Sequence, residues 1–94
     1  MGAVGETRPR IRVVVGDAHP EFRRAFRSTI STTSDVEIIG ETDDGLRALE
    51  LLRILRPHVA LLDADLPSLG GNAVARVLAD ELPDVHVVVL TGPE

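Results

Sequence analysis

The chain has 94 residues, 44% of them hydrophobic, and a formal net charge of −5. This length fits one globular domain or slightly less, and the scattered basic residues, all ten of them arginine, argue against a nucleic-acid surface. Without cysteine, disulfides and thiol chemistry are excluded, and the apolar stretches are too short for a signal peptide or a membrane span. We therefore expect a cytoplasmic chain with no membrane segment and no direct binding of nucleic acid.

Short apolar stretches alternate with amphipathic ones along the chain. Residues 1–10 are polar and aperiodic and predict a flexible tail, which leaves residues 11–94 for the folded domain. We predict strands at 11–16, 36–40, 59–63 and 85–90 from their apolar and β-branched residues. The predicted helices run from 20 to 30, from about 43–45 to 56, and from 72 to 82, with Pro57 and Pro83 closing the last two.

The predicted strands start at regular intervals of 23 to 26 residues, at positions 11, 36, 59 and 85. This is the spacing of βα units, which form a parallel sheet with right-handed crossovers and helices on both faces. The expected fold class is α/β, a doubly wound, flavodoxin-like sheet with strand order 2-1-3-4. In this order the switch point, where ligands collect, lies between the first and third strands.

Polar residues follow three of these strands at the point where each strand ends. Asp17 follows the first strand, Asp63 ends the third, and Thr91 follows the fourth. The carboxyl ends of parallel strands meet at one edge of the sheet, so two carboxylates and a hydroxyl are expected to converge there. Such a set suits Mg²⁺ and a phosphoryl group. The alternative for Asp63 is that it only caps the following loop.

Other polar groups have simpler interpretations. Arginines 23, 24 and 27 are expected to form a solvated helix face rather than a phosphate patch, opposite an apolar face at positions 22, 25, 26, 29 and 30. Asp43 and Asp44 are interpreted as helix caps before metal ligands. The histidines at 19, 58 and 86 are explained by their places at a helix start, a strand entry and a strand, and no two share metal-ligand spacing.

Several motifs together resemble the receiver domain of two-component response regulators. They are 17–20 (Asp-Ala-His-Pro), 61–67 (Leu-Leu-Asp-Ala-Asp-Leu-Pro), Gly71 and 89–92 (Val-Leu-Thr-Gly), and the His-Pro pair with Gly40-Glu41 is similar to the NarL-type subfamily. Members of this subfamily usually attach a carboxy-terminal helix-turn-helix to the receiver, which implies a role in transcription regulation.

The resemblance implies a phosphorelay function for this chain. Asp63 is then the phosphoacceptor, which attacks a phosphohistidine of a sensor histidine kinase, and Thr91 contacts the phosphoryl group. The metal ligands for Mg²⁺ are then Asp17, Asp63 and the backbone carbonyl of Asp65. The chain is expected not to be an enzyme, beyond catalysing its own phosphorylation.

Three differences from the family's pattern affect this expectation. The family has a second acid after the first strand, where this chain has Ala18, so we expect a weakened Mg²⁺ site. The family also has a lysine that clamps the phosphoryl oxygens, and this sequence contains no lysine. The family's last helix-strand-helix segment is absent, so the chain is expected to be a receiver truncated at its carboxyl end.

The residues leave two other functional classes open. One is a pseudo-receiver, a protein-protein interaction module that works without phosphorylation, which Ala18 and the missing lysine favour and which Asp63 and Thr91 disfavour. The other is a phosphatase of the haloacid-dehalogenase type, which residues 63–65 resemble superficially, although that family needs a lysine and a downstream acidic pair that this sequence lacks. The β-branched fourth strand is expected to form an exposed edge, so we also expect a homodimer or a domain-swapped assembly.

Overall fold

The computed structural model describes residues 9–33 and 35–92, so the predicted tail falls almost entirely outside the described residues. Within this part, four strands alternate with three helices. In chain order the elements are β1 (Ile11–Gly16), α1 (Pro20–Ile30), β2 (Val36–Thr42), α2 (Gly45–Leu55), β3 (Val59–Asp63), α3 (Gly71–Glu81) and β4 (His86–Leu90). In this same part, no helix is long and apolar enough to cross a membrane.

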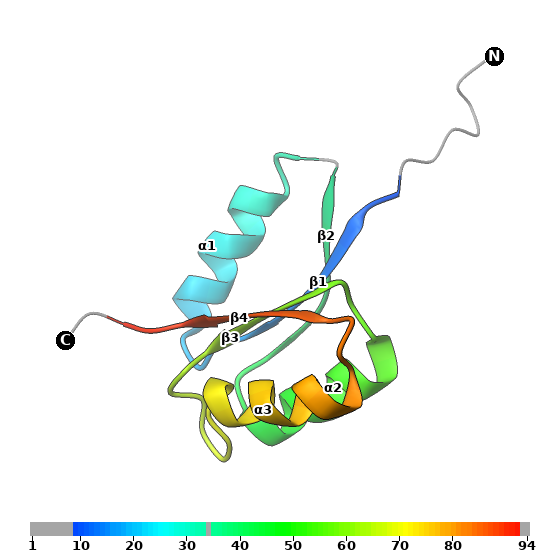
Figure 1. Cartoon of the computed structure of the whole chain (residues 1–94). Helices are drawn as coiled ribbons and strands as arrows, with labels where there is room; N and C mark the ends of the chain where they lie inside the picture. Colours follow the sequence, from blue (N-terminus) through cyan, green and yellow to red (C-terminus); the bar gives the residue numbers. More distant parts are fainter. Residues whose placement is uncertain (1–8, 34, 93–94) are drawn as a thin grey trace.

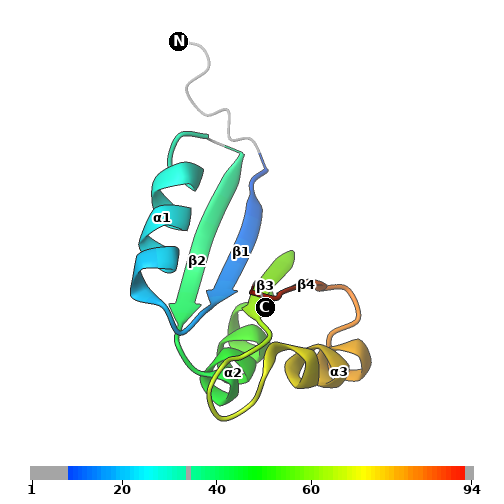
Figure 2. The same cartoon turned by 90° about the vertical axis from the view of Figure 1, so that its left-hand side faces the viewer.

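The strands form one parallel sheet in the order β2-β1-β3-β4, which confirms the predicted order. Figures 1 and 2 show α1 on one face of the sheet and α2 with α3 on the other. The change of winding direction lies between β1 and β3, which pair directly with each other. The carboxyl ends of these two strands therefore define the place where a site is expected.

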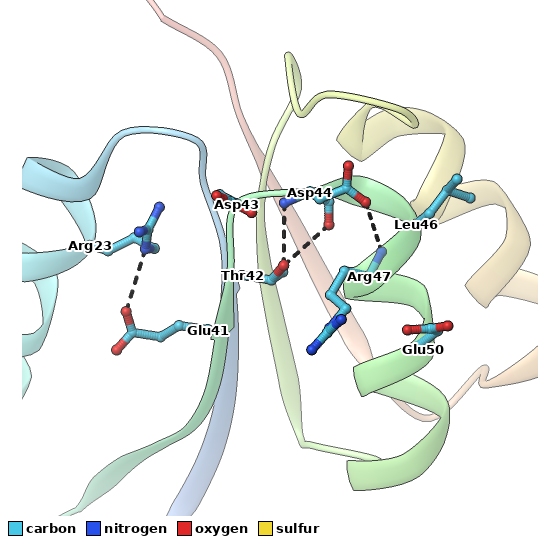
Figure 3. Close-up of a pocket in the computed structure, with 8 residues that line it drawn as sticks. All are labelled: Arg23, Glu41, Thr42, Asp43, Asp44, Leu46, Arg47 and Glu50. Carbon is cyan, nitrogen blue, oxygen red and sulfur yellow. Dashed lines mark hydrogen bonds and ion pairs between the residues drawn. The ribbon is translucent and has the colours of Figure 1, made fainter.

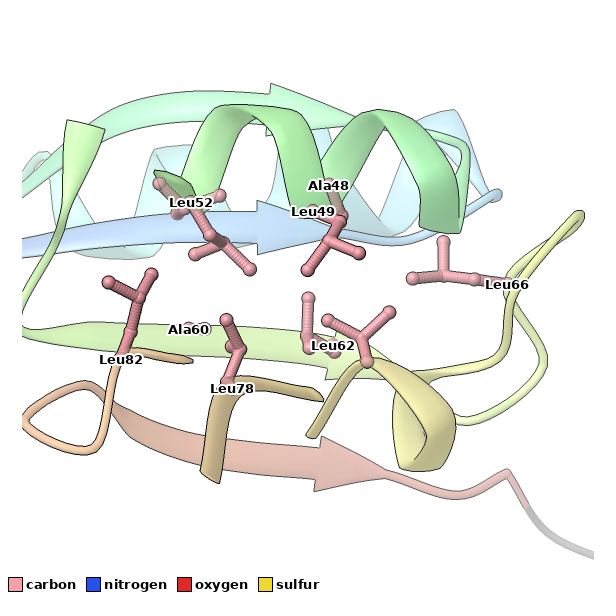
Figure 4. Packing of buried hydrophobic residues seen from close by; sticks show 10 residues of the cluster. Ala48, Leu49, Leu52, Ala60, Leu62, Leu66, Leu78 and Leu82 are labelled. Atoms are coloured by element: carbon pink, nitrogen blue, oxygen red, sulfur yellow. The ribbon is translucent and has the colours of Figure 1, made fainter. Parts of the chain in front are cut away.

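The hydrophobic core lies between the sheet and the pair α2 and α3 (Figure 4). Leu52 of α2, Leu62 of β3 and Leu78 of α3 are the largest side chains that are fully buried in it. Ala48 and Leu49 of α2 and Val74 of α3 are buried in the same core. Burial of a leucine side chain contributes roughly 1.5–3 kcal/mol, so these contacts fix both helices against the sheet.

The other face of the sheet is covered less completely. The apolar face predicted for α1 exists, but none of its residues is buried, and Phe22 is 36% exposed. The rings of Phe22 and Phe26 stack on each other with centroids 6.1 Å apart. α1 packs against β2 rather than against β3 and β4, so side chains on this face of the last two strands stay accessible.

Both ends of α2 are capped, the first by a favourable residue and the second by an arginine in an uncommon backbone conformation. The side chain of Asp44 accepts a hydrogen bond from the backbone N–H of Arg47 at 3.0 Å, which confirms the interpretation of Asp44 as a helix cap. At the other end, Arg56 has a left-handed backbone (φ 45°) and donates its N–H to Leu52 before Pro57. The two caps thereby set where α2 begins and ends between β2 and β3.

Candidate functional site at the carboxyl ends of β1 and β3

Two buried carboxylates meet at the switch point of the sheet. Asp17 directly follows β1 and Asp63 is the last residue of β3, and they are 6% and 7% exposed. With His19 they form a group whose ligand atoms all lie within 4.8 Å of one another. The structure thus brings together the two acids that the sequence predicts to converge.

The oxygens of the two acids have different surroundings. Asp17 Oδ1 accepts hydrogen bonds from the backbone N–H of His19 at 2.8 Å and from its ring, while Asp63 Oδ1 accepts one from the backbone N–H of Asp65 at 2.9 Å. Oδ2 of Asp63 accepts no hydrogen bond from the described residues, although that side chain is only 10% exposed. In a largely buried side chain, a carboxylate oxygen without a protein donor is open to water or to a cation beside it.

His19 is the residue of this cluster that sequence reasoning missed. Its Nδ1 lies 2.9 Å from Asp17 Oδ1 and 3.8 Å from Asp63 Oδ2, and its ring is 69% exposed. The hydrogen bond to Asp17 raises the pKa of His19 above its usual value, with a smaller contribution from the charge of Asp63. The available signal was the position of His19 two residues after Asp17, just before the proline that starts α1.

The other predicted site residues lie around this cluster without joining it. Asp65 is exposed in the turn after β3 and contributes its N–H to Asp63, so a role for its carbonyl stays a prediction. Thr91 follows Leu90, which pairs with Asp63 across the sheet, but Thr91 is exposed and no hydrogen bond joins it to Asp63 in the part of the chain described. Ala18 lies half-buried between Asp17 and His19 and offers no ligand atom.

The prediction of a fully solvated arginine face on α1 is wrong for Arg23. Its guanidinium donates a hydrogen bond to the backbone carbonyl of Asp17, and its side chain is only 19% exposed. Nε of Arg23 also lies 3.6 Å from Glu41, which Arg27 approaches at 3.4 Å. The reason is that β2 extends to Thr42 and brings Glu41 beside α1, which gives the arginines a partner.

An open, polar depression lies beside the cluster, between α1 and the start of α2 (Figure 3). It has a volume of about 640 Å³, and Arg23, Glu41, Asp43 and Arg47 contribute to its lining, which does not include Asp17 or Asp63. Charges of both signs line it, so it does not have the uniform sign of an anion-binding site. We therefore assign the chemistry to the carboxylates rather than to this depression.

The donor set of the cluster fits a divalent cation. Asp17 and Asp63 present carboxylate oxygens from two neighbouring strands, and Mg²⁺ is commonly bound by one or two carboxylates with the remaining positions filled by water and phosphate oxygens. One of these oxygens, Oδ2 of Asp63, has no hydrogen-bond donor among the described residues. Because Ala18 adds no ligand, the protein contributes few charges to such an ion.

Comparison with known proteins gives consistent matches. The family model of the response regulator receiver domain matches residues 13–94. "Probable transcriptional regulatory protein NarL" of Mycobacterium tuberculosis is 45% identical over 75 residues, which are 79% of this chain and 35% of that protein. "Response regulator GacA" of Pseudomonas aeruginosa is 35% identical over 86% of this chain and 38% of its own length.

Solved structures agree with these sequence matches. The signal receiver domain of NarL from Mycobacterium tuberculosis superposes with a TM-score of 0.87 at 37% identity, covering 93% of this chain and 70% of that one. The response regulator domain of Thermotoga maritima CheB gives a TM-score of 0.81 at 27% identity, covering 87% and 60%. The chain spans about a third of the length of the curated relatives that it matches. Through the family model, the relatives and the shared fold, the chain belongs to the response regulator receiver domain family, with a flavodoxin-like sheet and sequence features of the NarL type.

Proposed function

We propose that this chain accepts a phosphoryl group on Asp63 from the phosphohistidine of a sensor histidine kinase. The observation that carries the proposal is the position of Asp63, which is buried at the carboxyl end of β3 beside Asp17 and keeps Oδ2 free of hydrogen bonds from the described residues. In the reaction a carboxylate oxygen of Asp63 attacks phosphorus, the new O–P bond replaces the N–P bond, and the imidazole of the donor leaves.

The residues around Asp63 have defined tasks in this proposal. The N–H of Asp65 holds Oδ1 at 2.9 Å and so fixes the orientation of the carboxylate that attacks phosphorus. Asp17, Asp63 and the carbonyl of Asp65 would hold Mg²⁺, which would neutralise charge on the phosphoryl oxygens. We expect this site to be weaker than one with a further acid, since Ala18 occupies that place. Thr91 donates its hydroxyl to a phosphoryl oxygen after transfer.

The direct test is the mass of the intact 94-residue chain after incubation with Mg²⁺ and a small phosphodonor such as acetyl phosphate. We expect one phosphoryl adduct that is lost at alkaline pH, as an acyl phosphate is, and that is absent from the Asp63→Ala variant. Asp65→Ala serves as the matched control, since it removes an exposed neighbouring carboxylate and keeps the backbone groups. No adduct on a chain with native circular dichroism would contradict the proposal and favour a phosphorylation-independent interaction module.

The partners of the chain follow from the same proposal. The kinase is the donor of the phosphoryl group. The net charge of −5 argues against direct binding of nucleic acid by this chain, so any contact with DNA would be made by other parts of a longer regulator. We also propose that two copies associate, as a homodimer or by exchange of elements, because β4 forms one edge of the sheet. The cytoplasm is the compartment in which a sensor kinase would meet this chain.

A further inference from the structure

His19 brings a nitrogen donor to a pair of carboxylates. Its Nδ1 is directed toward Asp17 Oδ1 at 2.9 Å and Asp63 Oδ2 at 3.8 Å, while most of the ring is exposed to solvent. His19 has an extended backbone (φ −97°, ψ 110°) and precedes Pro20, the first residue of α1. The hydrogen bonds of its backbone N–H and its ring to Asp17 Oδ1 hold His19 beside the two acids.

The distances suit three ligands of one ion. Two ligand atoms that each lie about 2.1 Å from a common metal are about 3.0 Å apart at a right angle and about 4.2 Å apart on opposite sides. His19 Nδ1 lies 2.9 Å from Asp17 Oδ1 and 3.8 Å from Asp63 Oδ2, which are close to and within this range. The ligand atoms of the three residues all lie within 4.8 Å of one another. An ion would also satisfy Oδ2 of Asp63, which has no hydrogen-bond donor among the described residues.

We propose that His19 is a metal ligand through Nδ1, and that it strengthens the preference of this site for borderline divalent ions such as Co²⁺ and Zn²⁺ over Mg²⁺. The inference rests on the proposed function only in taking Asp17 and Asp63 as the other two ligands. Imidazole nitrogen is a good ligand for transition metals and Zn²⁺, whereas Mg²⁺ takes oxygen ligands and keeps its water. On binding, the metal replaces the proton that joins Nδ1 to Asp17 in the structure.

The residues on either side of His19 leave this role open to its imidazole. The residue between Asp17 and His19 is Ala18, whose methyl group cannot coordinate a metal. The nitrogen of His19 approaches from the solvent side of the same cluster, where the two acids leave it room, and its ring is 69% exposed. The donor set is therefore one nitrogen and two carboxylates instead of oxygen ligands alone.

Calorimetric titration of the 94-residue chain with CoCl₂ and, separately, with MgCl₂ tests the preference. We expect Co²⁺ to bind more tightly than Mg²⁺. His19→Ala should lower the affinity for Co²⁺ by at least about tenfold, because loss of even a supporting group at a metal site lowers metal affinity about 10–100-fold. Mg²⁺ affinity should change less than about twofold in the same variant. His86→Ala is the matched control, because it removes an exposed imidazole from β4, away from the cluster.

A second measurement reads the ligand atom directly in the parent chain. Nitrogen-15 chemical shifts of the histidine rings, followed during a titration with ZnCl₂, should move for Nδ1 of His19 to the range of a metal-bound nitrogen, while His58 and His86 keep their shifts. An unchanged Nδ1 shift at saturating Zn²⁺ would overturn the inference, even if the His19→Ala variant does not fold.

The result also separates this inference from the proposed function. Two outcomes would overturn the role of His19 and leave phosphorylation of Asp63 standing. In the first, His19→Ala weakens the binding of Co²⁺ and of Mg²⁺ equally. In the second, His19→Ala binds Co²⁺ as the parent does, whereas Asp63→Asn does not bind it. Loss of the phosphoryl adduct in a chain whose Co²⁺ binding depends on His19 would instead contradict the proposed function alone.

Discussion

At the scale of single residues, position 18 decides how much negative charge the site presents to a cation. Ala18 is half-buried between Asp17, which is 6% exposed, and His19, whose ring is mostly exposed. Its methyl group leaves Asp17 and Asp63 as the two carboxylates of the cluster. For oxygen ligands, affinity for a hard divalent cation depends strongly on how many charged groups coordinate it.

Ala18→Asp should therefore strengthen the binding of Mg²⁺. We expect an increase of at least about tenfold in affinity, since the new carboxylate lies next to the other two and Mg²⁺ sites have few charged protein ligands. The measurement is calorimetric titration with MgCl₂. Ala79→Asp is the control, because it adds the same charge at an exposed position of α3. Equal gains in the two variants would mean that net charge, and not coordination, determines the affinity.

The residue-level predictions from the sequence were most reliable where a strand placed the side chain. Asp17 and Asp63 were found because each ends an apolar run, and parallel strands bring their carboxyl ends together. His19 lies at the start of α1 as predicted, but its contacts and those of Arg23 were not predicted, because they are set by the direction in which α1 leaves the sheet, which periodicity does not determine. Arg23 contacts the carbonyl of Asp17 and the side chain of Glu41, and the latter comes from another strand.

At the scale of elements, the start of α2 and the loop after β3 hold each other in place. The carboxylate of Asp44 caps α2 and also accepts a hydrogen bond from the hydroxyl of Ser68 in that loop. Gly45 allows the close approach, since a Cβ at this position would lie 1.6 Å from the carbonyl oxygen of Leu69. The N–H of Gly45 also donates to the carbonyl of Pro67 at 2.9 Å, so the loop that carries Asp65 is anchored to the start of α2.

The charge on Asp44 should make this anchor depend on pH. The hydrogen bond from Ser68, followed by that from the N–H of Arg47, lowers the pKa of Asp44 below its ordinary value of 3.8. The contribution of Asp44 to stability is therefore full above about pH 3.8 and is lost as the pH falls through the lowered pKa of the folded state. We expect urea unfolding midpoints to show this decline in the parent chain below about pH 4.

Two variants separate the charge of Asp44 from its cap. Asp44→Asn keeps an oxygen that can accept from the N–H of Arg47, so it should retain most of the stability at pH 7 and lose the part that depends on Asp44 titration. Asp44→Ala should be less stable than Asp44→Asn at every pH, because it loses the cap as well. Identical pH profiles for the parent and Asp44→Asn would exclude a contribution from the carboxylate charge.

The order and type of every described element were predicted correctly, and the differences lie at the ends. β2 continues to Thr42 instead of Gly40, β4 starts at His86, and α3 runs from Gly71 to Glu81, one residue earlier than predicted at each end. These ends are fixed by pairing and close packing. Thr42 pairs with Gly16 of β1, and Gly71 starts α3 where a Cβ would lie 2.6 Å from the carbonyl oxygen of Asp63.

At the scale of the whole molecule, the two faces of the sheet differ in how they are covered. α2 and α3 bury one face, whereas α1 packs against β2 on the other (Figure 2). Val87 packs toward the core, so its neighbour Val88 points to the other face, where it is 45% exposed. Since β4 is an edge of the sheet, its exposed apolar side chain and its backbone are both accessible to a second chain.

We therefore expect the 94-residue chain to associate through β4, and Val88→Lys to weaken this association. A lysine on an edge strand opposes pairing because its charge would have to be desolvated, so the dissociation constant should rise by at least about tenfold, which is about 1.4 kcal/mol. Sedimentation equilibrium of both chains measures the change. Ile54→Lys is the matched control, because it places the same charge at an apolar residue that is 75% exposed on α2. A monomeric parent chain, or an equal effect of both variants, would contradict an interface at β4, since only pairing along this edge makes Val88 more sensitive than Ile54.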